Sequence, residues 1–226
     1  MKKGATKSAP EVLTVGHSTR PLEAFVEMLR AHGVQRVVDV RTVPRSRHNP
    51  QFSRDTLPAA LRPAGIGYIH MPALGGLRHA RPDSRNTAWR NASFRGFADY
   101  MQTPEFAAGL QALMALAARD RVALMCAEAV PWRCHRSLIA DALAARGIRV
   151  EHITSATRTR PHALTPWARV RGGRVTYPGE PGSPPPQPRA ASQRRPGMSL
   201  QGSGHRPVPP SGHRSGGRPS AAAHRR

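Results

Sequence analysis

The sequence predicts an α/β fold: a three-layer domain whose mostly parallel, five-stranded sheet carries helices on both faces, as in Rossmann-like and flavodoxin-like proteins. Two observations predict it. Short runs of Val, Leu and Ile, typical of buried strands, alternate with longer stretches whose apolar residues recur at helical spacing. The first strand, helix and strand together occupy about 30 residues, the size of a βαβ unit, which makes the strands parallel.

The first half of the domain contains three predicted strands and two helices. Residues 12–15 form a β-prone run, and a helix follows from Pro21 to Gly33 with an apolar stripe on one face. The second strand covers residues 34–41. A second helix is expected over residues 57–64, and residues 65–71 form the third strand after a glycine stop.

The second half continues the alternation. Two helices are predicted over residues 94–101 and 103–117, and the second opens with the Thr-Pro-Glu pattern of a capped helix. The fourth strand covers residues 122–125. An amphipathic helix then ends near Gly147, and residues 149–153 form the fifth strand.

Composition divides the chain into three parts. Residues 1–10 are polar and basic, residues 11–157 form the predicted domain, and residues 158–226 are rich in Pro, Gly, Ser, Arg and His. Segments of that composition cannot bury enough apolar area to offset the entropy of ordering them, so both ends are predicted to be disordered. Residues 1–157 hold 22 Lys and Arg against 12 Asp and Glu, and the tail holds 13 Arg against one Glu.

The net charge of +22 favours phosphate-bearing partners, either a small molecule or nucleic acid. The Arg-rich tail suits loose contacts to nucleic acid; the alternative is an inert extension. No run approaches the roughly 18 apolar residues of a membrane span. The start of the chain lacks the apolar region of a signal peptide, so we expect a cytoplasmic protein with no membrane partner.

The polar residues that could carry chemistry follow the predicted strands. In open α/β sheets, ligands bind at the carboxyl ends of the strands, where successive loops meet. The loop after residues 122–125 holds both cysteines of the chain. Residues 77–93 show little periodicity and are expected to lie over the site as an insertion. The loop residues that we expect to share this edge are His17, Ser18, Arg20, Asp39, Arg41, Arg45, Cys126, Glu128, Cys134, His135 and Arg136.

Cys134 is the candidate nucleophile, because a cysteine at a helix start beside Arg and His is expected to have a lowered thiol pKa. Glu128 or His135 would then move protons. The alternative is a small buried thiol that serves only packing. Asp39, at the end of a buried strand, is either an acid or base, or the ion-pair partner of Arg41 or Arg136.

Several cationic and polar side chains are candidates for binding an anion. Guanidinium groups bind phosphate and carboxylate in bidentate fashion, and the alternative for any one arginine is a solvated surface position. There is no GxGxxG or GxxxxGK[ST] pattern, so a nucleotide-binding fingerprint is absent. The candidates for anion binding are Arg20, Arg41, Arg45 and Arg136, with His17 and Ser18 beside them.

Zinc binds cysteine sulfur and histidine nitrogen, and Cys126, Cys134, His135 and His17 could supply such ligands. The seven residues between the two cysteines are not a usual ligand spacing, and no further cysteine pair exists. The sequence therefore predicts no cofactor, with zinc as the alternative.

Several short motifs follow one another along the domain: Thr14–Arg20, Val38–Arg41 with Pro44–Ser46, Leu74–Gly76, Trp89–Asn91 with Phe94–Gly96, Cys126–Glu128 and Cys134–Arg136. Together they resemble the domain of unknown function 488 family, over about residues 12–153 and in the order expected of it. The resemblance implies a compact α/β domain with a polar site built from these segments, and it implies no settled reaction.

These observations favour an enzyme, a transferase or hydrolase, that acts on a phosphorylated, nucleotide or nucleic-acid substrate at a basic pocket. One alternative is a non-catalytic nucleic-acid-binding module that uses the basic edge and the tail. Another is a metal or redox sensor built on Cys126 and Cys134.

Overall fold

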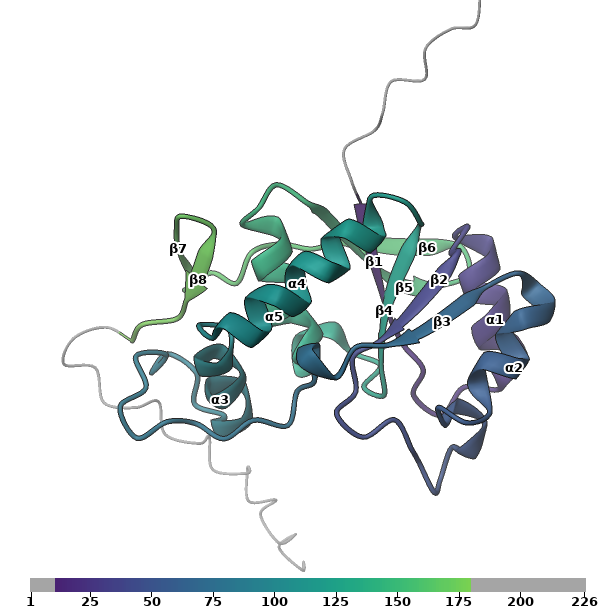
Figure 1. Cartoon of the computed structure of the whole chain (residues 1–226), viewed down its shortest axis with the longest axis horizontal. Coiled ribbons are helices and arrows are strands. Elements are labelled where there is room, and N and C mark those ends of the chain that lie inside the picture. The colour runs from purple at the N-terminus through teal and green to yellow at the C-terminus, as the bar shows by residue number, and fades with distance from the viewer. Residues whose placement is uncertain (1–10, 180–226) are drawn as a thin grey trace, which may run out of the picture. The chain divides into compact units, whose positions relative to one another are not determined.

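The computed structural model describes residues 11–179, and its elements follow the predicted order (Figure 1). None of the helices in this part of the chain has the length and apolar content needed to cross a bilayer. The strands are β1 (Glu11–Gly16), β2 (Arg36–Asp39), β3 (Gly67–His70), β4 (Val122–Cys126), β5 (Arg149–Ser155), β6 (Arg158–Pro161), β7 (Arg169–Arg171) and β8 (Arg174–Thr176). The α-helices are α1 (Leu22–Ala31), α2 (Leu57–Leu61), α3 (Ala92–Tyr100), α4 (Pro104–Ala117) and α5 (Arg136–Ala144).

One mixed sheet organises the domain, in the order β3-β2-β4-β1-β5-β6. The first five strands in this order pair in parallel, and β6 pairs antiparallel to β5. The predicted α/β fold with a mostly parallel sheet is confirmed, but the sheet has six strands, because β6 extends the predicted five. Since β4 lies between β1 and β2, the loops that follow these three strands leave the same edge side by side.

Helices cover both faces of the sheet, so there are two apolar cores. Successive strand residues point to opposite faces: Val12 packs into the core with α4 and α5, and Leu13 packs into the core with α1 and α2. Figure 1 shows α1 and α2 on one side of the sheet and α4 and α5 on the other. Burial on both faces explains why the strands read as continuous apolar runs.

The predicted boundary of the C-terminal tail at residue 158 is wrong for residues 158–179. This segment contains β6, β7 and β8 and places Tyr177 in full burial. The Tyr177 hydroxyl donates to Asp141 at 2.7 Å, and its backbone N–H donates to the Asn86 side chain at 2.8 Å. Composition misled here because only a few residues attach the segment: Ala168, Val175 and Tyr177 enter the apolar core, and Tyr177 adds these polar contacts. The predicted disorder of residues 1–10 and 180–226 lies outside the described residues.

Candidate functional site

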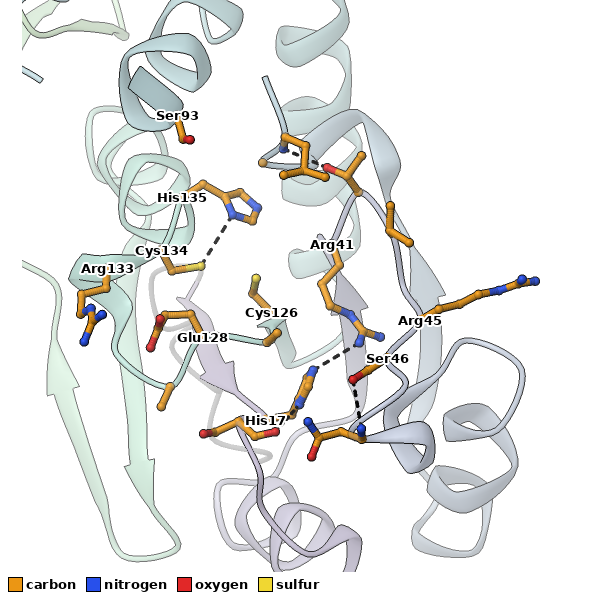
Figure 2. A pocket seen from close by; sticks show the side chains of 18 of the residues that line it. His17, Arg41, Arg45, Ser46, Ser93, Cys126, Glu128, Arg133, Cys134 and His135 are labelled. Carbon is orange, nitrogen blue, oxygen red and sulfur yellow. Dashed lines mark hydrogen bonds between the residues drawn. The ribbon is translucent and has the colours of Figure 1, made fainter. Parts of the chain in front are cut away.

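A pocket of about 660 Å³ opens at the carboxyl ends of β1, β2 and β4 (Figure 2). Three loops that are far apart in sequence line it, and each contributes residues that the sequence singled out. The β1 loop contributes His17 and Ser18, and the β2 loop contributes Arg41 and Arg45. The β4–α5 loop contributes the largest group: Cys126, Glu128, Arg133, Cys134 and His135.

Two glycines allow these loops to approach one another closely. A Cβ atom on Gly16, at the end of β1, would overlap the carbonyl oxygen of Glu128. A Cβ atom on Gly76 would overlap the imidazole ring of His135. Gly16 and Gly76 are therefore needed for space, because a side chain at either position would displace part of the β4–α5 loop.

Asp39 supports the pocket wall and does not line the pocket. Its two carboxylate oxygens accept bonds from Arg41 Nε at 2.9 Å and Nη2 at 2.6 Å, and the Tyr68 hydroxyl donates to it at 2.7 Å. Burial lowers the pKa of Arg41, but the hydrogen bonds and charge of Asp39 outweigh burial and raise it above the usual value. Of the two roles considered for Asp39, the geometry is that of an ion-pair partner for Arg41.

His17 is held as a neutral ring. It stacks on Phe52 with ring centroids 4.3 Å apart. The Arg41 guanidinium, 3.2 Å away, can only donate, so Nε2 of His17 accepts and Nδ1–H donates to the Ser18 carbonyl at 2.8 Å. Burial lowers the pKa of His17 to about 4, so its ring contributes no positive charge at neutral pH. Ser18 itself has a φ of 51°, a conformation that non-glycine residues adopt rarely and often at functional sites.

The two cysteines and His135 form one cluster inside the pocket. The Cys134 Sγ lies 3.6 Å from His135 Nδ1, and the ligand atoms of Cys126, Cys134 and His135 all lie within 4.8 Å of one another. Figure 2 shows both sulfur atoms and the imidazole ring converging on the same space. The hydrogen bond from the Cys126 thiol lowers the pKa of Cys134 well below that of an ordinary thiol, although burial acts in the opposite direction. The same hydrogen bond, with burial, raises the pKa of Cys126.

Arg136 lies beneath this cluster with only 1% of its surface exposed, so it does not reach a ligand in the pocket. Its Nε donates to Cys134 Sγ at 3.3 Å, and its Nη2 donates to the Glu128 carbonyl. No carboxylate within residues 11–179 forms an ion pair with it. A buried guanidinium needs an anionic partner, and the Cys134 thiolate is the group in position to be one.

The family model that matches this chain is described as domain of unknown function DUF488, and it covers residues 21–143. The chain belongs to this family. No curated protein and no solved structure matches the chain. The resemblance seen in the sequence motifs is therefore confirmed. Because the family description states no reaction, a function for this DUF488 domain has to be argued from its site.

The four-arginine clamp expected from sequence does not form in the DUF488 pocket. Arg20 lies outside it and donates to the Gly16 carbonyl at 3.4 Å, and Arg136 is buried below it. Arg45 lines the pocket with a 75% exposed side chain and lies 3.6 Å from Asp55. Arg133, which sequence reasoning did not select, also lines the pocket. Figure 2 shows Arg45 and Arg133 on opposite sides, with both guanidinium groups directed outward.

Sequence reasoning also missed the apolar residues at the pocket mouth. Val43 and Leu77 are 58% and 70% exposed and line the pocket, and Phe94 lines it as well. Leu77 and Ser93 belong to the segment expected to lie over the site, and both line the pocket. The middle of that segment packs elsewhere, since Asn86 bonds to Asp99 of α3 at 2.8 Å. Only the ends of residues 77–93 therefore contribute to the site.

Proposed function

We propose that this DUF488 domain is an enzyme, a hydrolase or transferase, that acts on a phosphate-bearing, nucleotide-like substrate in the pocket. One observation carries the proposal: side chains capable of catalysis and side chains capable of binding an anion line a single pocket. Cys126, Cys134, His135 and Glu128 come from the β4–α5 loop, and the arginines surround them. Clefts that combine apolar walls with a few convergent polar groups are the usual form of small-molecule sites.

The lining of the pocket suits a ligand with an anionic part and an apolar part. Arg41 is paired with Asp39 behind the wall, but Arg45 and Arg133 line the pocket with one carboxylate, that of Glu128, so cations are in excess among the lining residues. Arg45 and Arg133 are exposed, and their long side chains can turn inward onto a phosphate. The exposed apolar mouth fits a flat, weakly polar group such as a nucleobase.

Glu128 is the proposed proton acceptor. It is the only carboxylate among the pocket-lining residues, and Val130 N–H donates to its Oε1 at 3.2 Å. Figure 2 shows its carboxylate turned away from the two sulfur atoms, so water or substrate rather than a thiol is its partner. In hydrolysis, a water proton passes to Glu128 as the water oxygen bonds to the electrophilic atom. The bond to the leaving group then breaks, and the leaving group takes up that proton.

Ligand-induced stabilisation tests the binding half of the proposal. We expect nucleoside mono- and diphosphates to raise the melting temperature of the full-length protein more than nucleosides or inorganic phosphate do. The double substitution Arg45→Ala and Arg133→Ala should remove that increase. Arg30→Ala, an exposed arginine on α1 away from the pocket, is the matched control and should retain it. Equal stabilisation of both variants, or none by any nucleotide, would refute nucleotide binding here.

Turnover tests the catalytic half. Each stabilising ligand is incubated with the protein, and its products are followed by mass spectrometry. Glu128→Gln should reduce turnover by at least about 100-fold while binding persists, because a general base contributes 10²–10⁴ in rate. The non-catalytic alternative, a nucleic-acid module, rests mainly on the tail, most of which lies outside the described residues. A binding signal without turnover, lost on deletion of residues 180–226, would favour that alternative.

A further inference from the structure

The position of His135 in its pocket fixes which of its nitrogens is available to a ligand. Nε2 lies 3.0 Å from the backbone carbonyl oxygen of Val40, and a carbonyl can only accept. Nε2 therefore carries the proton, and Nδ1 presents its lone pair on the side where the two sulfur atoms lie. A histidine that binds a metal almost always donates its other ring N–H in this way, which fixes the tautomer and the ring orientation.

The separations within the cluster match those of ligands around one small ion. Tetrahedral zinc, with Zn–S of about 2.3 Å and Zn–N of about 2.0–2.1 Å, places a sulfur and a nitrogen about 3.6 Å apart. The Cys134 Sγ and His135 Nδ1 are 3.6 Å apart. Two zinc-bound sulfurs are expected about 3.8 Å apart by the same geometry. The three ligand atoms, all within 4.8 Å of one another, need only small side-chain adjustments to meet these values.

The surroundings of Cys134 favour a thiolate over a neutral thiol. Arg136 Nε donates to Cys134 Sγ, and the guanidinium has no carboxylate partner within residues 11–179. Gly76 leaves the space that the His135 ring occupies, since a Cβ atom there would overlap the ring. A fixed imidazole and a sulfur already paired with a cation are partly organised for an ion before it arrives.

We propose that Cys126, Cys134 and His135 bind one zinc ion whose fourth coordination position faces the pocket. Two sulfur ligands and one nitrogen ligand suit zinc better than the oxygen-preferring cations magnesium and calcium. Three protein ligands with an open position are typical of catalytic zinc sites, whereas structural zinc has four. This inference rests on the proposed function only for the use of the open position, where water or a substrate oxygen would bind.

Metal analysis of the full-length protein tests the site directly. The protein is purified without a metal-affinity tag, treated with a chelator, reloaded with Zn²⁺ alone and analysed for bound metal. We expect about one zinc per chain. Titration of the metal-free protein with Co²⁺ should produce the near-ultraviolet absorption of cobalt–thiolate bonds. Cys126→Ser, Cys134→Ser and His135→Ala should each weaken Co²⁺ binding by more than about 100-fold, since loss of an outer partner alone costs 10–100-fold.

A matched control separates loss of a ligand from loss of the fold. His70 is another half-buried histidine that bonds a backbone carbonyl, that of Arg41, at 2.8 Å, and it lies outside the cluster. His70→Ala should keep the zinc and the cobalt absorption. Should a cysteine variant unfold, the His135→Ala result and the cobalt spectrum of the wild type still decide the question.

Three results would overturn the zinc site: less than about 0.1 zinc per chain with no cobalt–thiolate band, zinc retained by both cysteine variants, or a Cys126–Cys134 disulfide in freshly purified protein. These results are independent of the proposed function. Nucleotide-dependent stabilisation and turnover in zinc-free protein would refute the zinc site and leave the proposed enzymatic function standing. Bound zinc, with no nucleotide-dependent stabilisation and no turnover, would support the zinc site and refute the proposed enzymatic function.

Discussion

Replacing Asp39 by Asn tests whether the Asp39–Arg41 pair supports the wall of the pocket. The substitution keeps the shape of the side chain and removes its charge. Asp39 is fully buried and the Arg41 side chain is 6% exposed, so water cannot replace the lost carboxylate. Asn keeps one acceptor oxygen, so the donors to the other oxygen lose their acceptor: with the amide nitrogen in the Oδ2 position these are Arg41 Nη2 and the Tyr68 hydroxyl. The guanidinium would remain buried without an anionic partner, held by the amide oxygen, the Phe52 carbonyl and His17.

Breaking a buried ion pair by removing one partner costs about 3–5 kcal/mol. If the free energy of unfolding falls by about 2 kcal/mol per molar urea, the urea concentration at the unfolding midpoint should be about 2 M lower for Asp39→Asn than for the wild type. Replacing both partners, as in Asp39→Leu with Arg41→Met, removes the stranded charge. The double variant should therefore be more stable than Asp39→Asn, although it lacks more native contacts.

Urea unfolding followed by circular dichroism measures these differences. Asp55→Asn is the matched control, because its partner Arg45 is exposed and lies 3.6 Å away. That exposed pair should contribute less than about 1 kcal/mol. The reasoning fails if Asp39→Asn costs no more than Asp55→Asn, or if the double variant is less stable than Asp39→Asn.

Three further predictions concern other parts of the domain. Burial lowers the pKa of His152 to about 4 in the folded state, and an unfolded histidine has a pKa of about 6.5. The unfolded state binds the proton more readily, so His152 should contribute a loss of stability of up to about 3 kcal/mol as pH drops from 6.5 to 4. In urea unfolding between pH 4 and 7, His152→Gln should remove this share and leave that of His17, whose pKa is also lowered to about 4. Deleting residues 180–226 should leave the melting temperature within a few degrees of the full-length value. Deleting residues 158–226 removes the buried Tyr177 and should lower the free energy of unfolding by at least about 4 kcal/mol. Equal melting temperatures for the two deletions would contradict a domain boundary after residue 179. Gly76→Ala should displace the His135 ring and weaken Co²⁺ binding by at least about tenfold while the far-ultraviolet dichroism stays native; unchanged cobalt affinity would show that the ring has room to move.

Most of the fold could be predicted from the sequence because the signal is local. Each strand that is buried on both faces reads as an apolar run, and α4 begins at the Thr103 cap, whose side chain accepts from Phe106 N–H. The C-terminal strands were missed because isolated residues attach them to the domain: Val175 and Tyr177 enter the apolar core, and Tyr177 also makes polar bonds. Its anchors, Asp141 and Asn86, are distant in sequence and carry no periodic pattern.

The candidate site was predictable only to the level of the loops. Topology brings the β1, β2 and β4 loops to one edge, so their polar residues could be expected together. The direction of each side chain could not be read from the sequence. Arg136 has the charge of an anion-binding residue but points beneath the pocket, whereas the neighbouring Arg133 lines it. Nothing in the pattern of the loop distinguishes these two arginines.

X-ray absorption at the zinc edge of the reloaded, full-length protein tests the central claim most directly, because it reports which atoms surround the ion. The Cys126, Cys134 and His135 site predicts two sulfur neighbours at about 2.3 Å and two nitrogen or oxygen neighbours at about 2.0–2.1 Å. On adding a stabilising nucleotide, the nitrogen and oxygen shell should change and the two sulfurs should remain. A shell of nitrogen and oxygen atoms alone, with no sulfur, would contradict the account.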